Sequence, residues 1–371
     1  MAYRFYGSED ASVTDRTGRT PCAYYDLVSK AWCAETCAPR MRDRWTPENR
    51  TLGQCSITAF LMQDVFGGEV RGVPLGDGNY HCFNVVGDCV FDLTSEQFGE
   101  AKLCYENCPV QDRAVHFQKA EKHARYRLLR ARLAAALDAQ DNATLIDHWS
   151  RAFSETAGET PAAADVPDWK TIAPSEKLFR AAASLGGCQR ALDYGCGSAW
   201  AAIIAAKSGC PDVTAADAAP GAITAAKARA ALYGVQNCVH PVCVALNWLE
   251  TIPANTYDGL ICSNVLDVVP SQTATDMLRA FAKITTPDAT VVIGLNFYLS
   301  PEAAAQRGVT LADGSRLYQN GVLRLVSRTD EAWAAQFAPY FTVERLEHFA
   351  WPGEPRETRR LFYLRKGKRK G

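Results

Sequence analysis

Hydrophobic and polar positions follow three patterns along the chain. Residues 24–98 combine one apolar helical run with short strand-like runs, and residues 118–137 show helical spacing of Leu and Ala among charged side chains. From about residue 171 onward, strand-like runs alternate with helix-like runs. The predicted strands cover 190–194, 213–216, 259–263, 290–295, 341–351 and 357–366, and the predicted helices cover 175–184, 199–209 and 222–233. Such alternation is typical of βαβ units on a parallel sheet, here closed by two antiparallel strands.

The change of pattern predicts two domains. A chain of 371 residues is long enough for two or three domains at about 150 residues each. We expect a linker or irregular domain entrance at 138–170. Residues 138–142 are polar, and residues 154–168 are rich in small residues and prolines. The expected fold is therefore an N-terminal α+β domain at 1–137 and a C-terminal α/β domain at 171–371, with a doubly wound, Rossmann-like sheet.

Composition narrows the class of protein. The chain has 40 Lys and Arg against 41 Asp and Glu, and this net charge of -1 does not favour a nucleic-acid coat protein or an anionic membrane as the partner. No run approaches the roughly 18 apolar residues that span a bilayer, and the N-terminus lacks the pattern of an export signal. We therefore expect a soluble cytoplasmic protein whose 14 cysteines are reduced.

Two glycines in the second half predict a nucleotide-type ligand site. In the run RALDYGCG, a strand ends at Asp193 and is followed by Gly195, Gly197 and a helix. Glycines let the backbone approach a ligand, and a helix N-terminus presents free N–H groups. Asp217 ends the next predicted strand, where a carboxylate accepts hydrogen bonds from ribose hydroxyls. The full G-x-G-x-x-G pattern is absent, which favours a cofactor without a pyrophosphate.

These motifs resemble those of class I S-adenosylmethionine-dependent methyltransferases, over about residues 145–371. The resemblance rests on Leu192–Gly197, on Asp217 with residues 218–223, and on YDGLICSNVLDVVP at 257–270. It implies S-adenosylmethionine as the cofactor and S-adenosylhomocysteine as the product. The implied cofactor residues are Asp193, Gly195 and Gly197 on the methionine side, Asp217 at the ribose, Ala218 at the adenine edge, and Asn264 and Val265 beside the sulfonium.

The predicted methyl acceptor is a small molecule or a modified peptide. The fourth motif is SNVLDV, not the N-P-P-[YF] of methyltransferases that act on nucleobase or protein amino groups, which favours O- or N-methylation of a small molecule. In this family the segment before the closing hairpin builds a substrate cap, here about 297–335. The candidate acceptor-binding residues are Asp267, Tyr298, Arg324 and Arg328. The alternative to anion binding is that the two arginines form a solvent-exposed pair or hold an acidic neighbour.

Cys55 differs from the other cysteines by its position. It directly precedes the apolar helical run SITAFLMQDVF, so it lies in the first turn of a helix, where the helix dipole lowers the pKa of a thiol. Downstream, NYHCFNVV and CVFDLT predict an antiparallel hairpin with a turn at Gly87-Asp88. His81 and Asp92 can then face each other, which is the arrangement in which a carboxylate orients an imidazole that activates a thiol.

The N-terminal motifs resemble the YunG-like family over about residues 20–135. The resemblance rests on WTPEN at 45–49, GQCSITAFLMQDVFGGE at 53–69, NYHCFN at 79–84 and FDLTSEQF at 91–98. It implies a transglutaminase-like, papain-like fold. Gln54 or Asn49 is then the candidate donor to an oxyanion, because tetrahedral intermediates need preorganised donors. The alternative is that Cys55, His81 and Asp92 are packing and turn residues of a recognition module.

Two cysteine pairs share a spacing of four residues. Cys33 with Cys37 and Cys104 with Cys108 would each lie on one face of a helix, and four converging thiolates could bind zinc. The pairs lack the two-residue spacing of common zinc knuckles. We therefore expect packing roles and no metal, with zinc and a disulfide as alternatives.

Together these features predict a bifunctional enzyme. A Cys-His-Asp domain acting on an amide or ester is fused to a methyltransferase, which suggests tailoring of a specialised metabolite or modified peptide. One alternative is an N-terminal domain that binds the acceptor without catalysis. Another is an RNA target, with the basic tail RKGKRKG at 365–371 as an electrostatic aid.

Overall fold

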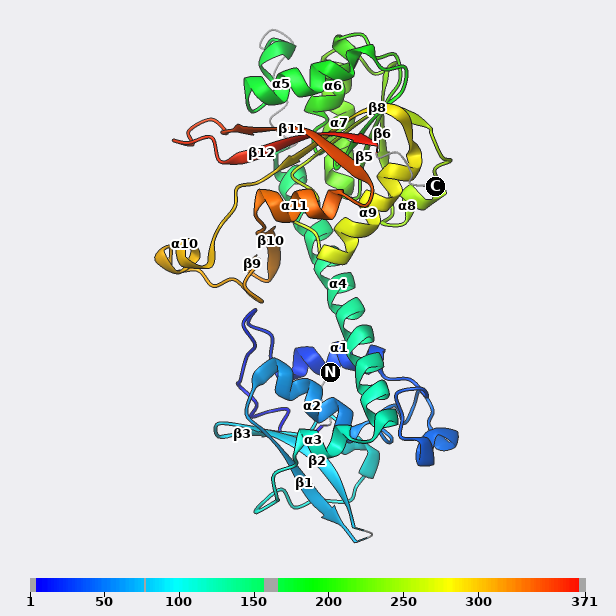
Figure 1. Cartoon of the computed structure of the whole chain (residues 1–371), viewed down its shortest axis with the longest axis vertical. Helices are drawn as coiled ribbons and strands as arrows, with labels where there is room; N and C mark the ends of the chain where they lie inside the picture. Colours follow the sequence, from blue (N-terminus) through cyan, green and yellow to red (C-terminus); the bar gives the residue numbers. More distant parts are fainter. Residues whose placement is uncertain (1–4, 77, 157–165, 367–371) are drawn as a thin grey trace. The chain divides into compact units, whose positions relative to one another are not determined.

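The computed structural model describes residues 5–76, 78–156 and 166–366, and the chain divides into two compact units, Met1–Gln140 and Asp141–Gly371 (Figure 1). Most of the basic tail and much of the proline-containing stretch at 154–168 lie outside the described residues. Within the described part of the chain, no helix is long and apolar enough to span a bilayer.

The first unit packs helices against a small antiparallel sheet of order β1-β2-β3. Its elements are α1 (Pro21–Ala31), η1 (Pro39–Arg44), α2 (Cys55–Phe66), β1 (Glu69–Leu75), β2 (Asn79–Val86), β3 (Cys89–Phe91), η2 (Ser95–Phe98), α3 (Arg113–Phe117) and the start of α4 (Ala120–Thr156). The predicted hairpin is confirmed, with Val86 paired to Cys89 across the turn. The sequence reasoning missed β1, whose Gly and Pro are unusual in a strand.

The core of this unit explains why α2 is so apolar. Ile57, Phe60 and Met62 of α2 are fully buried and pack with residues of α1, the sheet and α4. Asn84 of β2 donates from Nδ2 to the carbonyl of Ala59 at 2.8 Å, which ties the strand to the helix. The N-terminus of α2 is therefore held at a fixed place over the sheet.

Helix α4 occupies most of the segment that composition assigns to a linker. It continues to Thr156, so residues 138–156 are helical and the expected irregular entrance is wrong for this stretch. The physical reason is that the polar residues there have specific partners. The Tyr318 hydroxyl donates to Asp141 at 2.6 Å, and Asn142 donates from Nδ2 to Thr273 at 2.9 Å.

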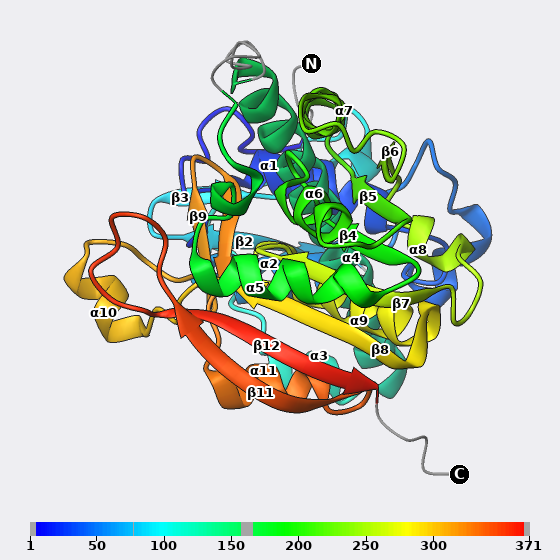
Figure 2. The same cartoon turned by 90° about the horizontal axis from the view of Figure 1, so that it is seen from above.

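The second unit contains a seven-stranded sheet of order β11-β12-β8-β7-β4-β5-β6, which can be followed from β12 to β6 in Figure 2. Its strands are β4 (Ala191–Tyr194), β5 (Val213–Asp217), β6 (Val239–Cys243), β7 (Tyr257–Ser263), β8 (Thr285–Leu295), β11 (Phe341–Phe349) and β12 (Arg359–Lys366). Strands β4 to β8 are parallel, whereas β12 pairs antiparallel with both β8 and β11. The predicted parallel sheet with an antiparallel finish is confirmed.

Two apolar cores cover the two faces of this sheet. One contains α5 (Glu176–Ala183), α6 (Trp200–Lys207) and α7 (Pro220–Leu232). The other contains α8 (Trp248–Thr251), α9 (Ser271–Ile284) and α11 (Asp330–Phe337), together with Leu145 of α4. Because both faces of the sheet are buried, the central strands carry apolar residues that solvent does not reach, such as Leu260, Cys262 and Ile293.

The segment predicted as a substrate cap forms its own small structure. It contains α10 (Pro301–Gln306) and a two-stranded sheet of β9 (Arg316–Gln319) and β10 (Val322–Val326). Leu299, Ala304, Leu311 and Leu325 make a separate small core beneath it. The backbone N–H of Val326 donates to the carbonyl of Asp267 at 2.6 Å, which joins β10 to the loop after β7.

Candidate functional site

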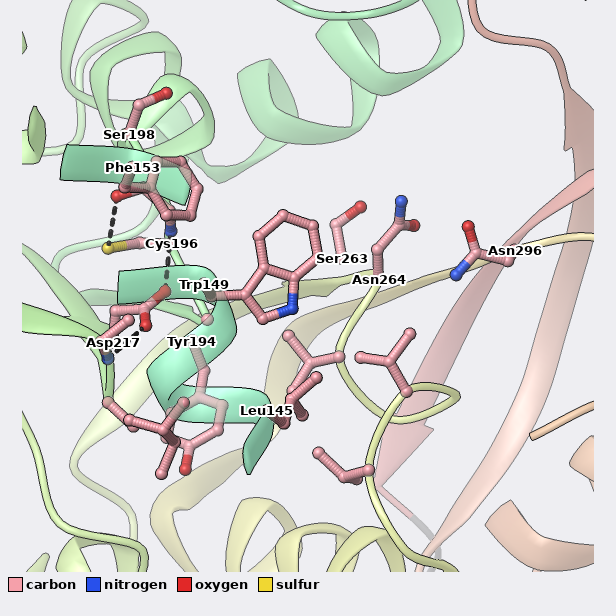
Figure 3. A pocket seen from close by; sticks show the side chains of 18 of the residues that line it. Leu145, Trp149, Phe153, Tyr194, Cys196, Ser198, Asp217, Ser263, Asn264 and Asn296 are labelled. Atoms are coloured by element: carbon pink, nitrogen blue, oxygen red, sulfur yellow. Dashed lines mark hydrogen bonds between the residues drawn. The ribbon is translucent and has the colours of Figure 1, made fainter. Parts of the chain in front are cut away.

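A cavity of about 530 Å³ lies at the carboxyl ends of the parallel strands in the second unit. This volume is within the range of about 300–1,000 Å³ for small-molecule sites. The loops after β4, β5 and β7, the end of α4 and strand β10 all contribute to its wall (Figure 3). The lining is mostly apolar, with Asp217, Arg324 and Arg359 as its charged residues.

The turn after β4 and the end of β5 form one end of this cavity. Gly195 and Gly197 adopt left-handed backbone conformations, with φ of 72° and 52°. The backbone N–H of Gly197 donates to Asp217 at 2.9 Å, and that of Ala219 donates to the other carboxylate oxygen at 2.8 Å. Burial raises the pKa of Asp217, and these two N–H groups oppose the shift. Gly195, Gly197, Asp217 and Ala218 all line the cavity, so the structure brings together these four predicted cofactor residues.

The loop after β7 supplies the next part of the wall. Asn264 has a left-handed backbone, and its side-chain Oδ1 is buried without a hydrogen-bond partner among the described residues. Val265 lies beside it, so close to Gly195 that a Cβ there would come within 2.1 Å of the valine Cγ2. Asn264 and Val265 line the cavity as predicted.

Asp193 is not among the residues that line the cavity, and its direct role at the cofactor stays a prediction. Its carboxylate is buried and accepts a hydrogen bond from the backbone N–H of Ala202 at 3.0 Å. Burial raises its pKa to about 7, with the Ala202 N–H opposing the shift. Asp193 therefore acts as a positioning residue that fixes the turn after β4 to helix α6.

Three of the four predicted acceptor residues also lie away from the cavity wall. Asp267 is fully buried and accepts a hydrogen bond from the backbone N–H of Asn296. Tyr298 is exposed, and Arg328 donates to Gln336 and to Ser271. Protein groups or solvent contact these three side chains in the structure, and their direct acceptor role stays a prediction. Arg324 does line the cavity.

Sequence reasoning missed the contribution of α4. Asn142, Leu145, Ile146, Trp149 and Phe153 recur at helical spacing, and all five line the cavity (Figure 3). The spacing of three and four residues was the available signal. The polar and alanine-rich composition of this part of α4 suggested a linker instead.

The residues present fit S-adenosylmethionine on three observations. The glycine turn exposes backbone to the cavity, and a Cβ at Gly197 would meet Phe153 at 2.9 Å. A carboxylate, Asp217, stands at the end of the second strand, where ribose hydroxyls are bound in such sheets. The unpartnered Oδ1 of Asn264 offers an acceptor to a cationic or N–H group. These groups would hold the ribose and the methionine part.

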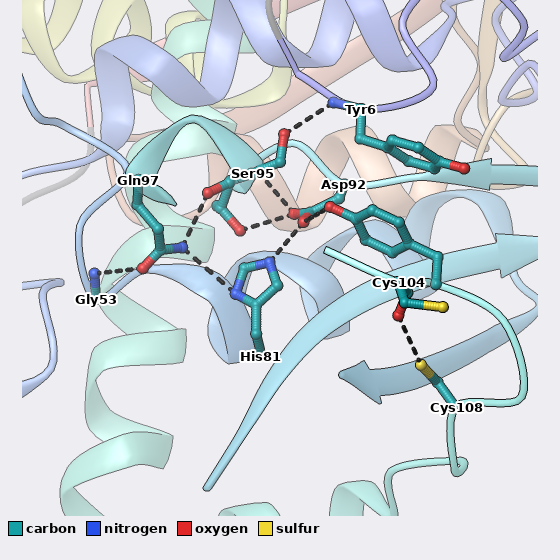
Figure 4. Close-up of polar contacts among 10 residues, drawn as sticks. Tyr6, Gly53, His81, Asp92, Ser95, Gln97, Cys104 and Cys108 are labelled. Carbon is teal, nitrogen blue, oxygen red and sulfur yellow. Dashed lines mark hydrogen bonds and ion pairs between the residues drawn. The ribbon is translucent and has the colours of Figure 1, made fainter. Parts of the chain in front are cut away.

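A second cluster of predicted site residues lies in the first unit. Cys55 is the first residue of α2, His81 is on β2, and Asp92 directly follows β3. The His81 Nε2 lies 2.5 Å from the Asp92 carboxylate, and both side chains are 1 % exposed (Figure 4). The Cys55 thiol lies close enough to the His81 imidazole for each group to shift the pKa of the other, and the Gln97 amide nitrogen lies 3.5 Å from His81 Nδ1. The structure therefore brings together the three predicted residues in the order thiol, imidazole, carboxylate.

The pKa shifts in this trio favour an ion pair. Burial opposes ionisation of Cys55, but the hydrogen bond and charge of His81 outweigh it, so the pKa of the thiol is lowered. Burial also opposes the charge of His81, but the hydrogen bond and charge of Asp92 raise the pKa of the imidazole to about 10. Near neutral pH the arrangement favours a thiolate beside an imidazolium, the reactive form of a cysteine nucleophile.

Three further residues orient the trio and were missed from the sequence. Thr94 donates to Asp92 from its backbone N–H at 2.9 Å and from its hydroxyl at 3.0 Å, and Tyr105 donates its hydroxyl to the same carboxylate at 2.9 Å. Gln97 accepts from the backbone N–H of Gly53 at 3.3 Å (Figure 4). Thr94 is only two residues from Asp92, whereas Gln97 and Tyr105 lie further along the chain, where no periodic spacing links them to the trio.

The two predicted oxyanion donors occupy different places. Gln54 is buried next to Cys55, and its Nε2 donates to the carbonyl of Cys33 at 3.1 Å. Asn49 is exposed in the turn before α2. In this conformation the Gln54 amide is therefore engaged, and the free N–H groups of the first turn of α2 are the remaining donors beside Cys55.

The cysteine pairs do not lie on helices, so their predicted helical faces are wrong. Cys33 and Cys37 flank a turn after α1, and Cys104 and Cys108 belong to an irregular segment. The Cys108 thiol donates to the Cys104 carbonyl at 3.4 Å (Figure 4). All four thiols are free, and no group of three metal-binding side chains occurs in the described residues.

The lowered thiol pKa makes a pH prediction. The pH profile of Cys55 alkylation by iodoacetamide is expected to lie at lower pH than that of free N-acetylcysteine, because His81 lowers the pKa of the thiol. The alkylation rate of free N-acetylcysteine should keep rising with pH until the pH exceeds the ordinary thiol pKa of about 8.5. Peptide mapping by mass spectrometry from pH 5 to 9 measures both rates. In His81→Ala the Cys55 profile should move to higher pH, and an unmoved profile would contradict the ion pair.

Comparisons with known proteins agree with the two units. Residues 191–288 match the family model described as a methyltransferase domain, and residues 20–138 match the model described as YunG protein. An uncharacterized protein YunG of Bacillus subtilis (strain 168) is 39% identical over 66 residues, which are 18% of this chain and 56% of that protein. The match thus spans little more than half of this relative.

Solved methyltransferase structures resemble the chain more distantly. An S-adenosylmethionine-dependent methyltransferase from Mesorhizobium loti is 21% identical, with a TM-score of 0.42, covering 53% of this chain and 99% of the other. The 1,6-didemethyltoxoflavin-N1-methyltransferase of Burkholderia thailandensis, with bound S-adenosylhomocysteine, is 18% identical, with a TM-score of 0.44, covering 62% and 90%.

The family match and the sheet order define the class of each unit. The second unit contains a class I methyltransferase domain, an enzyme domain whose cofactor is S-adenosylmethionine. The first unit contains a YunG domain.

Proposed function

We propose that the chain is a bifunctional enzyme. Its second unit transfers a methyl group to an oxygen or nitrogen atom of a small molecule or modified peptide, and its first unit carries out acyl transfer or amide hydrolysis through Cys55. The observation that carries the methyl-transfer proposal is the cavity that joins Asp217 to Asn264. The contact of His81 with both Cys55 and Asp92 carries the acyl-transfer proposal.

For methyl transfer, the protein's task is positioning. S-adenosylmethionine, when bound, would supply a methyl group that is already activated for transfer to a lone pair of the acceptor. Holding the two reacting atoms about 3–3.5 Å apart can supply much of the rate. Asp217 and the glycine turn would hold the cofactor at one end, while the apolar residues of α4 and the loop after β7 exclude water from the other.

For acyl transfer, the three side chains have distinct roles. The Cys55 thiolate attacks the acyl carbon, and the His81 imidazolium gives its proton to the leaving amine or alcohol. Water then attacks the thioester, His81 takes the water proton, and the thiolate is released with the acid product. Asp92 holds the imidazole, and Thr94 and Tyr105 hold Asp92. Fixing the imidazole in this way favours the thiolate form of the enzyme before acylation and after hydrolysis of the thioester.

The YunG domain is proposed to have a transglutaminase-like, papain-like fold. A helix with a cysteine at its N-terminus, followed by antiparallel strands that carry His and then Asp, supports this assignment. The alternative is a domain that only binds the acceptor. The buried, fully partnered carboxylate of Asp92 favours catalysis, since a binding module does not require a charged group 1 % exposed beside a histidine.

Two variants of the full chain test bifunctionality. Cys55→Ala is expected to lose acylation of the N-terminal site while binding S-adenosylhomocysteine with unchanged affinity. Asp217→Ala is expected to show the reverse pattern. Calorimetry and mass spectrometry measure the two activities. A wild type that is never acylated would favour the binding-module alternative, and a wild type that does not bind S-adenosylhomocysteine would contradict methyl transfer.

A further inference from the structure

Arg324 is a cation in the cavity wall that no carboxylate neutralises in the described part of the chain. It is half-buried on β10, and its guanidinium lies over the ring of Trp149 at 5.2 Å. Its Nη1 donates to the Nε2 of His148. No ion pair links Arg324 to an acidic side chain among the described residues, although nearby Asp147 is paired with Arg151 at 2.7 Å.

The charge of Arg324 is not offset by its neighbour His148. Burial and the positive charge of Arg324 lower the pKa of this histidine, so it is neutral near pH 7 and serves as a hydrogen-bond acceptor. The stacked Trp149 and the bond to His148 fix the guanidinium at the wall. A fixed, uncompensated guanidinium facing a cavity is suited to binding a carboxylate.

The other charges of the cavity are already compensated. Arg359 forms two short contacts with Glu354, at 2.7 and 3.0 Å, and its guanidinium lies 3.8 Å from the centre of the Trp351 ring. Asp217 accepts two backbone N–H groups at the cofactor end. Among the described residues of this wall, Arg324 is therefore the cation that has no acidic partner, whereas Asp217 at the other end serves the cofactor.

A second unpartnered polar group lies on the same wall. Asn142 is 6% exposed, and its Nδ2 donates to Thr273 at 2.9 Å, so its amide orientation is set. Its Oδ1 is buried without a partner in the described residues, which is costly unless a ligand donates to it. Trp149, Val268 and Leu323 add apolar side chains to the lining of the same cavity.

We propose that the methyl acceptor is a small aromatic acid. Its carboxylate binds Arg324, its flat ring packs on the apolar surface beside Trp149, and an N–H or O–H group donates to the Asn142 Oδ1. This inference rests on the proposed methyl-transfer function, whose acceptor it specifies. The carboxylate of the cofactor's methionine part is the competing source of the same chemistry, and the experiment separates the two.

The experiment uses the full chain saturated with S-adenosylhomocysteine and two probes of equal shape, naphthoate and naphthamide. Calorimetry is expected to show naphthoate binding at least about tenfold more tightly, because it alone makes a charge-assisted bond to Arg324. Arg324→Gln should abolish the preference, and Arg324→Lys should retain part of it. The matched control is Arg307→Gln, an exposed arginine of the cap that does not line the cavity.

The outcomes separate this inference from the proposed function. Equal binding of the two probes, or binding of neither, overturns the acid acceptor while S-adenosylhomocysteine binding still supports methyl transfer. If Arg324→Gln weakens S-adenosylhomocysteine tenfold and leaves the naphthoate preference intact, the arginine serves the cofactor and the inference is wrong. If the wild type does not bind S-adenosylhomocysteine, the proposed methyl-transfer function fails and the inference fails with it.

Discussion

Incubated with p-nitrophenyl acetate, the wild-type protein is expected to gain an acetyl group on Cys55 and to release p-nitrophenolate in a burst. Cys55→Ala should show no burst, because the thiolate that attacks the acetyl carbon is gone. His81→Ala should acetylate about a hundredfold to ten-thousandfold more slowly, the usual contribution of a positioned acid and base. Absorbance and mass spectrometry follow the two products.

The control for this prediction is Cys243→Ala, because Cys243 is an exposed cysteine of the other unit. Its burst should equal that of the wild type. If acetyl groups accumulate equally on Cys55 and Cys243, the site has no special reactivity, and the N-terminal domain would then be better described as a binding module.

Asp217→Ala is expected to lower the affinity for S-adenosylhomocysteine by at least about a hundredfold. The substitution removes the carboxylate available to the ribose, and hydrogen bonds to charged groups contribute about 1.5–3 kcal/mol each. It also leaves the backbone N–H groups of Gly197 and Ala219 without their acceptor, which loosens the glycine turn. Calorimetry on the full chain measures the change.

Asp212→Ala is the matched control for Asp217→Ala. Asp212 directly precedes the same strand at its opposite end, where it pairs with Arg190 at 2.8 Å on the surface. The variant is expected to bind S-adenosylhomocysteine like the wild type. Equal losses in both variants would mean that the effect arises from the stability of β5 and not from a cofactor contact.

Local patterns predicted the ranges of six of the seven strands of the C-terminal sheet, all except β6. Its strands are short apolar runs between turn residues, and Gly195, Gly197 and Asp217 lie at strand ends, so spacing alone placed them at one edge. The residues that bind the methyl acceptor were harder to predict, because only tertiary packing decides whether a side chain reaches the cavity. Arg324 and Arg328 are four residues apart, yet one lines the cavity and the other bonds to Ser271.

The N-terminal trio was also accessible from sequence, for a different reason. Cys55 at a helix start, and His81 and Asp92 in one hairpin, involve short separations with defined geometry. Gln97 lies in the short helix η2 and Tyr105 in the irregular segment that follows it, and their contacts depend on tertiary packing. No periodic sequence pattern predicts these contacts, so only the three-dimensional structure identifies them.

The continuity of α4 bears on how this enzyme can be dissected. A truncated methyltransferase begun at residue 171, or at the family-model boundary of 191, would lack Asn142, Trp149 and Phe153 and would expose the interior of the pocket to water. An isolated catalytic fragment must therefore retain the helix from Asp141 onward. The fragment that encloses this pocket is thus longer than the stretch at 191–288 that matches the methyltransferase family model.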